Sequence, residues 1–423
     1  MRVLVVGGGG REHALAWKLS QNAALDRLYA APGNPGIEAL ASCEPIQATD
    51  IEAILDVVKR ESIDLTVVGP EAPLVAGLAD RLEERGHRAF GPVAGVARIE
   101  GSKVWAKELC ERHGIPTGRG QVFTEVEPAA EHLDSLEPPF VVKAEGLAAG
   151  KGVTVAESRD EALGAIRAAL VEGAFGKAGE RVLVEEHLSG QEVSALALTD
   201  GRSVIPLAMA QDFKRAHDGD AGPNTGGMGA YSPVPFVDQA TATRIATQIL
   251  EATIRALRAE GLRYRGVLYA GLMLTEDGPK VLEFNCRFGD PEAQAVIPRL
   301  SSDLAELLLA CTEGNLHVYR PAWTSEACVT VVLASGGYPG QHRTGFPIEG
   351  LDEASRSDKV EVFHAGTARR DGRVVTAGGR VLAVSALGED LAEARRRAYQ
   401  ACARISFEGM QHRTDIAKEA AGG

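Results

Sequence analysis

The chain has 423 residues, which is long enough for several domains rather than one core. Its 58 acidic residues outnumber its 45 lysines and arginines, so the net charge is −13, and it contains no long basic run. This balance argues against nucleic acid and anionic membranes as partners, although a local basic pocket for phosphates stays possible.

The six cysteines are scattered, without Cys-x-x-Cys pairs or histidines at metal-binding spacing, which is typical of free thiols in a reducing compartment. The N-terminus passes directly from an apolar run into glycines, unlike a signal peptide, and no apolar run is long enough to span a bilayer. We expect a soluble, cytoplasmic protein.

Residues 2–6 predict a short strand, residues 7–10 are all glycine, and a helical pattern follows from about 11 to 21. Amide groups at a helix N-terminus point toward an anion, so this order of strand, loop and helix predicts a phosphate site. The expected ligand is a sugar phosphate held by Gly8, Gly9 and Gly10, which we call the glycine loop. The alternative is a tight turn without a ligand.

The same stretch does not fit a dinucleotide-binding fingerprint. Its third glycine position holds Glu12 or His13, depending on where the count begins. The second predicted strand, at 27–31, also ends without the acidic residue that would hold a ribose hydroxyl. A single sugar phosphate therefore fits the loop better than NAD.

Alternating strands and helices continue with a predicted helix near 50–61 and a predicted strand at 65–68. Ligands of open α/β sheets bind at the carboxyl ends of strands, and the loops there contain Asn34, Gly36 and Glu71. Glu71 could bind a hydroxyl or an amine, or could only favour the N-terminus of the next helix.

A helix predicted at 102–113 is followed by a smaller unit at about 119–189. In this unit, strands predicted at 140–143 and 153–155 flank a glycine-rich loop at 146–152. A glycine-rich loop between two strands can fold over phosphates as a lid, because its backbone amides act as donors.

The lid loop is not a Walker A loop. Three residues rather than four separate its glycines, Gly152 replaces the Ser or Thr, and a strand follows instead of a helix. Lys143 and Lys151 would add positive charges beside the phosphates. An ordinary glycine hairpin is the alternative, but so many glycines would weaken a turn that had no function.

A strand predicted at 181–185 leads into a charged segment at 186–192, which is either a hinge that binds a nucleotide base and ribose or an ordinary charged turn. The loop at 211–231 combines mixed charges with clustered turn residues, which favours an ordered loop that binds substrate. We call it the substrate loop. A long helix is predicted at about 238–260.

The strongest pattern lies on a strand predicted at 279–285, whose hairpin partner is 266–274. Side chains two apart on a strand share a face, so Glu283, Asn285 and, one step beyond, Arg287 line up. A carboxylate beside an amide oxygen suits a hard cation such as Mg²⁺, which usually also binds substrate phosphates. The Arg287 guanidinium offers a planar fork for a carboxylate or a phosphate.

A solvated polar face is the alternative for this strand, but the turn at 289–292 adds Gly, Asp and Glu to its end and favours a site. A linker is predicted at 313–326. The last segment reads as a compact α+β domain, with strands at 329–333, 360–363, 373–376 and 380–385 and a helix at 388–407.

These patterns predict a multidomain chain of α/β and α+β class. The units are an N-terminal parallel α/β domain at 1–118, a lid subdomain at 119–189, a catalytic subdomain at 190–325 and a C-terminal α+β domain at 326–423.

Several motifs together resemble the ATP-grasp fold, namely Ser102-Lys103, Val142-Lys143-x-x-Gly146, the lysine-bearing lid, Glu185-Glu186-x-Leu188 and Glu283-x-Asn285. Other segments narrow the resemblance to the phosphoribosylamine–glycine ligase family over essentially the whole chain: 7–14, 32–36, 68–74, 222–233 and 287–292. The run from Gly222 to Pro233 is the most specific of these.

The resemblance implies ATP-dependent ligation of glycine to phosphoribosylamine through a glycyl phosphate, in de novo purine biosynthesis. It implies ATP as co-substrate, Mg²⁺ or Mn²⁺ as the metal on Glu283 and Asn285, and only small-molecule partners for a chain that we expect to be a monomer. The implied catalytic residues are Arg287, Asp212 and Asp290.

For ATP binding the resemblance implies Lys103, Lys143, Gly146, Gly150, Lys151, Gly152, Glu185, Glu186, Leu188 and Glu192. For substrate binding it implies Gly8, Gly9, Gly10, Asn34, Gly36, Glu71, Thr225, Gly226, Gly227 and Arg287.

Two other functions compete with this one. Another ATP-grasp ligase or carboxylase would share the lid and the metal-binding strand but not the run at 222–233. A nucleotide-linked oxidoreductase is suggested by the glycine loop, but the missing third glycine and acidic residue argue against it.

Overall fold

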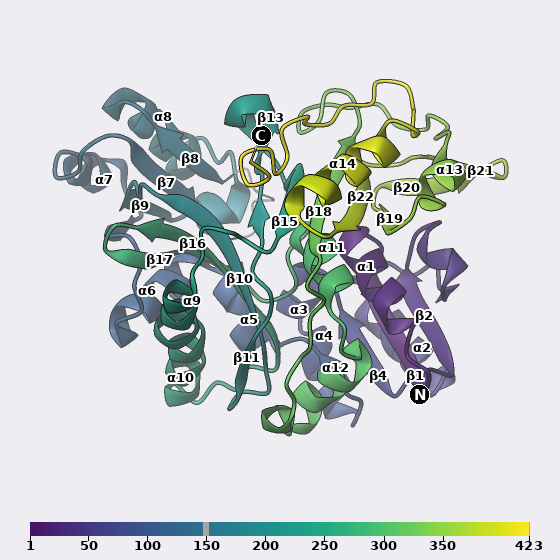
Figure 1. Cartoon of the computed structure of the whole chain (residues 1–423). Helices are drawn as coiled ribbons and strands as arrows, with labels where there is room; N and C mark the ends of the chain where they lie inside the picture. The colour runs from purple at the N-terminus through teal and green to yellow at the C-terminus, as the bar shows by residue number, and fades with distance from the viewer. Residues whose placement is uncertain (147–151, 423) are drawn as a thin grey trace.

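The computed structural model describes residues 1–146 and 152–422, and it has the mixed α/β architecture that the sequence predicts (Figure 1). The predicted lid residues Gly150 and Lys151 lie outside the described residues. Within the described part of the chain, no helix is both long and apolar enough to cross a membrane.

The N-terminal sheet has the strand order β3-β2-β1-β4-β5, and every pair in it is parallel. Its central strands are buried apolar runs, as expected when helices cover both faces of a parallel sheet. The strands are β1 (Arg2–Gly7), β2 (Arg27–Pro32), β3 (Ser42–Cys43), β4 (Leu65–Val68) and β5 (Ala89–Phe90). The helices are α1 (Gly10–Leu19), α2 (Ile51–Arg60), α3 (Glu71–Val75), α4 (Leu78–Glu84) and α5 (Ala94–Gly101).

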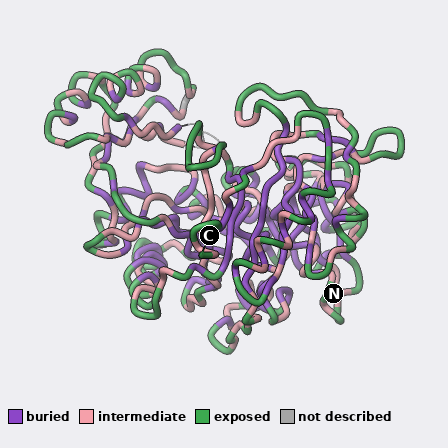
Figure 2. The backbone as a smooth tube through the Cα atoms, turned by 45° about the horizontal axis from the view of Figure 1, so that its top comes forward, coloured by how far each residue is buried: buried purple, intermediate pink, exposed green. Residues whose placement is uncertain are grey.

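Helix α6 (Lys103–His113) confirms the predicted start and end. The Ser102 hydroxyl accepts a hydrogen bond from the Trp105 amide at 3.1 Å, and Gly114 ends the helix with a left-handed φ of 66°. The lid unit follows, with an antiparallel sheet of order β6-β9-β7-β8. It has its own small core, and the backbone tube shows buried stretches inside it (Figure 2). Its elements are β6 (Gly120–Phe123), α7 (Val126–Leu133), β7 (Phe140–Ala144), β8 (Val153–Ala156), α8 (Arg159–Leu170) and β9 (Val182–Glu186).

The central sheet has the order β11-β10-β16-β17 and contains the predicted hairpin. Its strands are β10 (Gln191–Thr199), β11 (Val204–Pro206), β16 (Gly266–Thr275) and β17 (Gly278–Asn285). The helix predicted at 238–260 is divided by a π-helical stretch, Ile245–Leu250, into α9 (Gln239–Arg244) and α10 (Glu251–Ala259). Helices α11 (Glu292–Val296) and α12 (Leu304–Glu313) follow.

The C-terminal sheet has the order β12-β15-β18-β22-β19. Its first two strands, β12 (Gln211–Asp212) and β15 (Gly229–Ser232), come from the substrate loop, which also contains the hairpin β13 (Arg215–His217) and β14 (Ala221–Asn224). The substrate loop is therefore built partly into a sheet whose other strands lie more than 90 residues further along the chain.

The remaining C-terminal strands are β18 (Ala327–Ala334), β19 (Val360–His364), β20 (Thr367–Arg370), β21 (Arg373–Thr376) and β22 (Arg380–Gly388), with helices α13 (Leu351–Ser355) and α14 (Leu391–Cys402). The last helix is shorter than predicted because β22 continues to Gly388 and the Asp390 carboxylate caps the helix through the Glu393 amide. The predicted linker at 313–326 contains a short 3-10 turn at Leu316–Val318 and a β-bridge between Trp323 and Leu300.

Two buried histidines join the N-terminal and C-terminal parts. His13 on α1 accepts a hydrogen bond through Nδ1 from the His364 amide at 2.8 Å, and the two rings meet edge to face. Burial lowers the pKa of His13 to about 3, with a contribution from His364, and burial lowers that of His364 to about 4 with a contribution from Arg369.

Acid should therefore destabilise the fold. A lowered histidine pKa contributes stability that is complete above the ordinary value of 6.5 and is lost as the pH falls toward the folded-state value. For His13 alone the loss at about pH 5 should be about 2 kcal/mol. Thermal unfolding between about pH 7 and pH 5 measures it, and His13→Gln, which cannot titrate, should show a flatter profile. An equal slope in both proteins would contradict this origin.

Candidate active site

Strand β17 places Glu283 and Asn285 on one face, since they pair with Gly271 and Tyr269 of β16, two residues apart. Burial would raise the pKa of Glu283, but the charges of Lys214, Lys143, Lys103 and Arg287 hold it below its ordinary value. The carboxylate is thus an ionised group surrounded by cations. The cations favour anionic phosphates, and the ionised carboxylate among them favours a divalent metal.

Two of those lysines come from different units. Lys103, at the start of α6, donates to the Gly146 carbonyl at 2.9 Å. Lys143 on β7 pairs with the buried Glu185 carboxylate at 2.5 Å and donates to the Leu282 carbonyl at 3.0 Å. The predicted ATP-binding residues Lys103, Lys143, Gly146 and Glu185 therefore lie together beside β17, and Gly152 follows at the lid, where its carbonyl accepts from the Ala144 amide at 2.8 Å.

The other predicted ATP-binding residues are more spread out. Glu186 lies at the edge of the lid unit, where it pairs with Arg119 at 2.8 Å, and Leu188 is buried nearby. Glu192 instead faces the substrate loop, where it pairs with Lys214 at 2.7 Å. Glu192 therefore has a different ion-pair partner from Glu185.

Lys214 is a residue that the sequence-based candidate set missed. Its Nζ also lies 4.0 Å from the Asp212 carboxylate. Burial raises the pKa of Asp212 to about 8, with Lys214 opposing the shift and Glu292, Glu192 and Glu283 adding to it. A carboxyl group of this kind gains or loses a proton near neutral pH, which suits proton transfer.

Arg287 extends beyond β17 and pairs with two carboxylates of the N-terminal unit. Its Nη2 lies 2.8 Å from Glu100, and its Nε lies 3.5 Å from Glu71. The Asn285 amide satisfies its neighbours when its nitrogen faces Glu100, to which it then donates at 3.2 Å; in that orientation its oxygen points away from the carboxylate. Both ion pairs of Arg287 therefore reach across to the N-terminal unit rather than to the carboxylates of the turn at 289–292.

The glycine loop is packed too closely for side chains. A Cβ on Gly8 would lie 2.4 Å from the Gly33 carbonyl oxygen, and one on Gly10 would lie 2.5 Å from Gln294. Asn34 holds the loop by donating to the Gly8 carbonyl at 2.9 Å, and Gly36 packs against His13. The Asn34 and Gly36 positions are therefore structural supports of the glycine loop as well as predicted substrate contacts.

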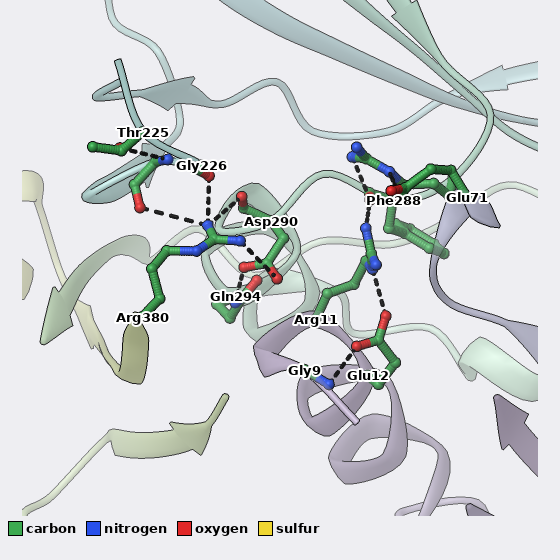
Figure 3. Close-up of polar contacts among 12 residues, drawn as sticks. Gly9, Arg11, Glu12, Glu71, Thr225, Gly226, Phe288, Asp290, Gln294 and Arg380 are labelled. Carbon is green, nitrogen blue, oxygen red and sulfur yellow. Dashed lines mark hydrogen bonds and ion pairs between the residues drawn. The ribbon is translucent and has the colours of Figure 1, made fainter. Parts of the chain in front are cut away.

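Glu12 and Arg11 complete the glycine loop, although neither was among the predicted site residues. The Glu12 carboxylate accepts from the Gly9 amide at 2.6 Å and from Arg11 Nε at 2.6 Å (Figure 3). Arg11 also donates to the Phe288 carbonyl at 3.0 Å, which links α1 to the residue that follows Arg287. Both residues belong to the glycine-rich motif in the sequence, which was the available signal.

The third part of the site joins the substrate loop to the turn at 289–292. Arg380 of β22 pairs with the Asp290 carboxylate at 3.3 Å and reaches the Gly226 carbonyl (Figure 3). Thr225 accepts from the Gly227 amide at 2.9 Å. Burial would raise the pKa of Asp290, but Arg380, Arg11, a hydrogen bond from Gln294 and Arg287 hold it below its ordinary value. Arg380 lies 90 positions from Asp290, and no sequence pattern indicated it.

The residues present fit a magnesium ion only in part. Glu283 and Asn285 offer the oxygen donors that Mg²⁺ prefers, and Glu283 is held ionised. In the described residues, no group of three or more His, Cys, Asp and Glu side chains is placed to hold a metal. These two residues would thus supply part of a shell that substrate phosphates and water complete.

Three family models together match most of the chain. They are the N domain of phosphoribosylglycinamide synthetase at residues 1–100, its ATP-grasp (A) domain at 101–293 and its C domain at 328–419. The parallel N-terminal sheet lies within the first of these ranges, and the lid and the central sheet lie within the second.

Several known proteins are similar in sequence to this chain over nearly its whole length. The chain is 51% identical to the phosphoribosylamine–glycine ligase of Rhizobium meliloti over 416 residues, covering 98% of both chains. It is 50% identical to that of Escherichia coli over 420 residues, again covering 98% of both. The crystal structure of the Thermotoga maritima ligase superposes with a TM-score of 0.86 at 36% identity, over 99% of this chain and 100% of that one.

Biotin carboxylase from Campylobacter jejuni also superposes, with a TM-score of 0.75 over 100% of this chain and 95% of that chain, but at 14% identity it shares the fold alone. This likeness agrees with the shared fold that the motifs indicate. The narrower assignment to one family rests on the full-length relatives. The chain belongs to the phosphoribosylamine–glycine ligase family.

Proposed function

We propose that this chain joins glycine to phosphoribosylamine through a glycyl phosphate, converting ATP to ADP and phosphate and forming glycinamide ribonucleotide in purine biosynthesis. Relatives with about half of their residues identical over the full length carry this ligase name. The observation that carries the proposal is the ionised Glu283 among three lysines, next to Arg287 and within the same site as the glycine loop.

The ATP side comprises the lysines, the segment 185–192 and β17. Lys103 and Lys143 would neutralise phosphate charge, and the segment from Glu185 would bind the base and ribose. Bound Mg²⁺ or Mn²⁺, held by Glu283 and Asn285, would stabilise charge on the transferring phosphoryl group. Such transfer depends on positioning and electrostatics more than on covalent help.

Arg287 would hold the glycine carboxylate in line with the γ-phosphoryl group. A carboxylate oxygen bonds to the γ-phosphorus while the bond to ADP breaks. The amine of phosphoribosylamine then bonds to the glycyl carbon, and phosphate leaves with that oxygen. The amine must lose a proton in this step, and Asp212, whose pKa is about 8, is suited to exchange it. The ionised Asp290, beside the glycine loop, is suited to accept a hydrogen bond from the attacking amine.

Phosphoribosylamine would bind with its phosphate at the glycine loop. The proposed contacts are Gly8, Gly9, Gly10, Asn34, Gly36 and Glu71 from the N-terminal unit and Thr225, Gly226 and Gly227 from the substrate loop. The loops meet around Asp290, since a Cβ on Gly9 would lie 3.7 Å from its Oδ2.

The direct test is formation of ADP with each substrate left out in turn. The proposal predicts that ADP release requires both glycine and phosphoribosylamine and matches glycinamide ribonucleotide one to one. ADP release that needs neither substrate, or that needs another amine, would contradict it.

Gly9→Val should weaken the binding of phosphoribosylamine and leave the binding of ATP nearly unchanged. A Cβ at Gly9 would lie 2.7 Å from Glu12 Oε2, so the substitution displaces the carboxylate that holds the loop. All the proposed ATP residues except Lys103 belong to other units. Measuring the Michaelis constant of each substrate checks this. Loss of ATP binding with a normal constant for phosphoribosylamine would reverse the assignment of the two sites.

All six cysteines are free, which supports a cytoplasmic location. The proposed units are 1–118, 119–189, 190–325 and 326–423, with a monomer as the working form. The boundary proposed at 325 also divides the C-terminal sheet, because two of its strands, β12 and β15, come from the preceding unit.

A further inference from the structure

One side chain of the C-terminal sheet holds two separate segments of the site. Arg380 is the first residue of β22, and its guanidinium extends away from the sheet (Figure 3). Its Nη1 donates to the Gly226 carbonyl and, at 2.7 Å, to the Asp290 carbonyl. Its Nη2 lies 3.3 Å from the Asp290 carboxylate. The planar fork therefore fixes the substrate loop against the turn at 289–292.

The Gly226 peptide is held from both sides by this corner of the C-terminal unit. Its carbonyl accepts from Arg380, and its amide donates to the Tyr338 hydroxyl at 3.0 Å. Both partners are packed closely around the peptide. A Cβ on Gly226 would lie 3.0 Å from Arg380 Cζ, and a Cβ on Gly379 would lie 2.2 Å from the Tyr338 ring. The position of this peptide is thus set by residues outside the substrate loop.

The Asp290 carboxylate is oriented in the same way. Arg380 lies at its Oδ2, and Gln294 donates to its Oδ1 at 2.7 Å. Oδ2 also faces the glycine loop, at 3.7 Å from the Cβ position of Gly9, and Gln294 packs against Gly10. A ligand on the glycine loop would therefore meet a carboxylate whose direction depends on Arg380.

We propose that Arg380 is a positioning residue for the phosphorylated amine substrate, because it sets Gly226 and Asp290 relative to the glycine loop. The inference rests on the proposed binding of phosphoribosylamine at that loop. Arg380 itself need not touch the substrate. A lysine would keep the charge, but one ammonium could not replace both guanidinium nitrogens, Nη1 at the two carbonyls and Nη2 at the Asp290 carboxylate.

The test is Arg380→Met, which keeps the length of the side chain and removes its donors. The Michaelis constant for phosphoribosylamine should rise about tenfold or more, while the constants for ATP and glycine change less than about twofold. Arg369→Met is the matched control, because Arg369 likewise joins the C-terminal unit to another unit, through a surface pair with Glu38 at 3.4 Å, but does not hold Gly226 or Asp290. It should leave all three constants unchanged.

A purely structural role would give a different pattern. Arg380→Met would then lower the melting temperature and the active fraction without changing any Michaelis constant, or would raise all three constants together, and either result would overturn the inference. Recovery of the wild-type constant by Arg380→Lys would also overturn it, since charge alone would then suffice.

If Arg380→Met fails to fold, Tyr338→Phe tests the positioning of the same Gly226 peptide by removing only the hydroxyl that accepts from its amide. It should raise the constant for phosphoribosylamine about threefold or more, and no selective rise would overturn the inference. Failure of the proposed function is separable, because the wild-type chain would then make no glycinamide ribonucleotide. If the wild-type chain turns over normally but neither variant selectively raises the Michaelis constant for phosphoribosylamine, only the role of Arg380 is overturned.

Discussion

Glu283→Gln should lower turnover by on the order of a hundredfold or more while the fold survives, the range expected when one preorganised electrostatic contact is lost. The substitution keeps the shape of the side chain and removes the charge that faces Lys103, Lys143 and Lys214. It also removes the only carboxylate proposed to hold the metal. The variant should lose affinity for the metal more than affinity for ATP. Raising the Mg²⁺ concentration should therefore recover part of the activity.

The measurement is turnover as a function of Mg²⁺ concentration, with thermal unfolding as a check on the fold. Glu276→Gln is the matched control, since Glu276 lies at the exposed end of the same hairpin. It should behave as wild type. Near-normal activity of Glu283→Gln at low Mg²⁺ would show that this carboxylate is not part of the metal site.

Arg287→Lys should raise the Michaelis constant for glycine strongly and lower turnover. Lysine keeps the charge but loses the fork that would hold a carboxylate with two hydrogen bonds. Loss of a charge-assisted pair in a dry site costs on the order of 2–5 kcal/mol, or about one and a half to nearly four decades in kcat/KM. Steady-state kinetics with glycine varied measures this loss.

The structure provides the competing explanation for Arg287. Its guanidinium lies 2.8 Å from Glu100, a buried carboxylate whose pKa is raised by burial, against the opposing charge of Arg287. If Arg287 only neutralises Glu100, the lysine variant would lose thermal stability while glycine kinetics in the folded fraction stayed normal. Arg299→Lys is the matched control, because Arg299 is also buried but bonds to Ser232 and the Glu326 carbonyl instead. Arg299→Lys should lower the thermal stability without changing the Michaelis constant for glycine.

Local rules predicted the parts of the site that lie on one element. The alternation of β17 placed Glu283 and Asn285 on one face, and the Ser102 cap set the start of α6, because both depend on neighbours within a few residues. The same rules failed for the substrate loop. Its strands β12 and β15 are short and gain their hydrogen bonds from a sheet that the chain completes more than 90 residues later.

The contacts that the sequence did not indicate are those between distant segments. Glu100 reaches Arg287, and Arg380 reaches Gly226 and Asp290, across separations for which no spacing rule exists. Lys214 was visible as a charge in the substrate loop, but only the fold shows that it faces Asp212 and Glu192. Charged residues in a loop have many possible partners, so their roles depend on the tertiary structure.

The central claim, that glycine is activated as a glycyl phosphate, is tested most directly by labelling the glycine carboxylate with oxygen-18. Bonding of a carboxylate oxygen to the γ-phosphorus, followed by attack of the amine, leaves that oxygen on the released phosphate. We therefore expect one labelled oxygen in each phosphate formed from ATP, labelled glycine and phosphoribosylamine. Unlabelled phosphate released while glycinamide ribonucleotide accumulates would contradict the account.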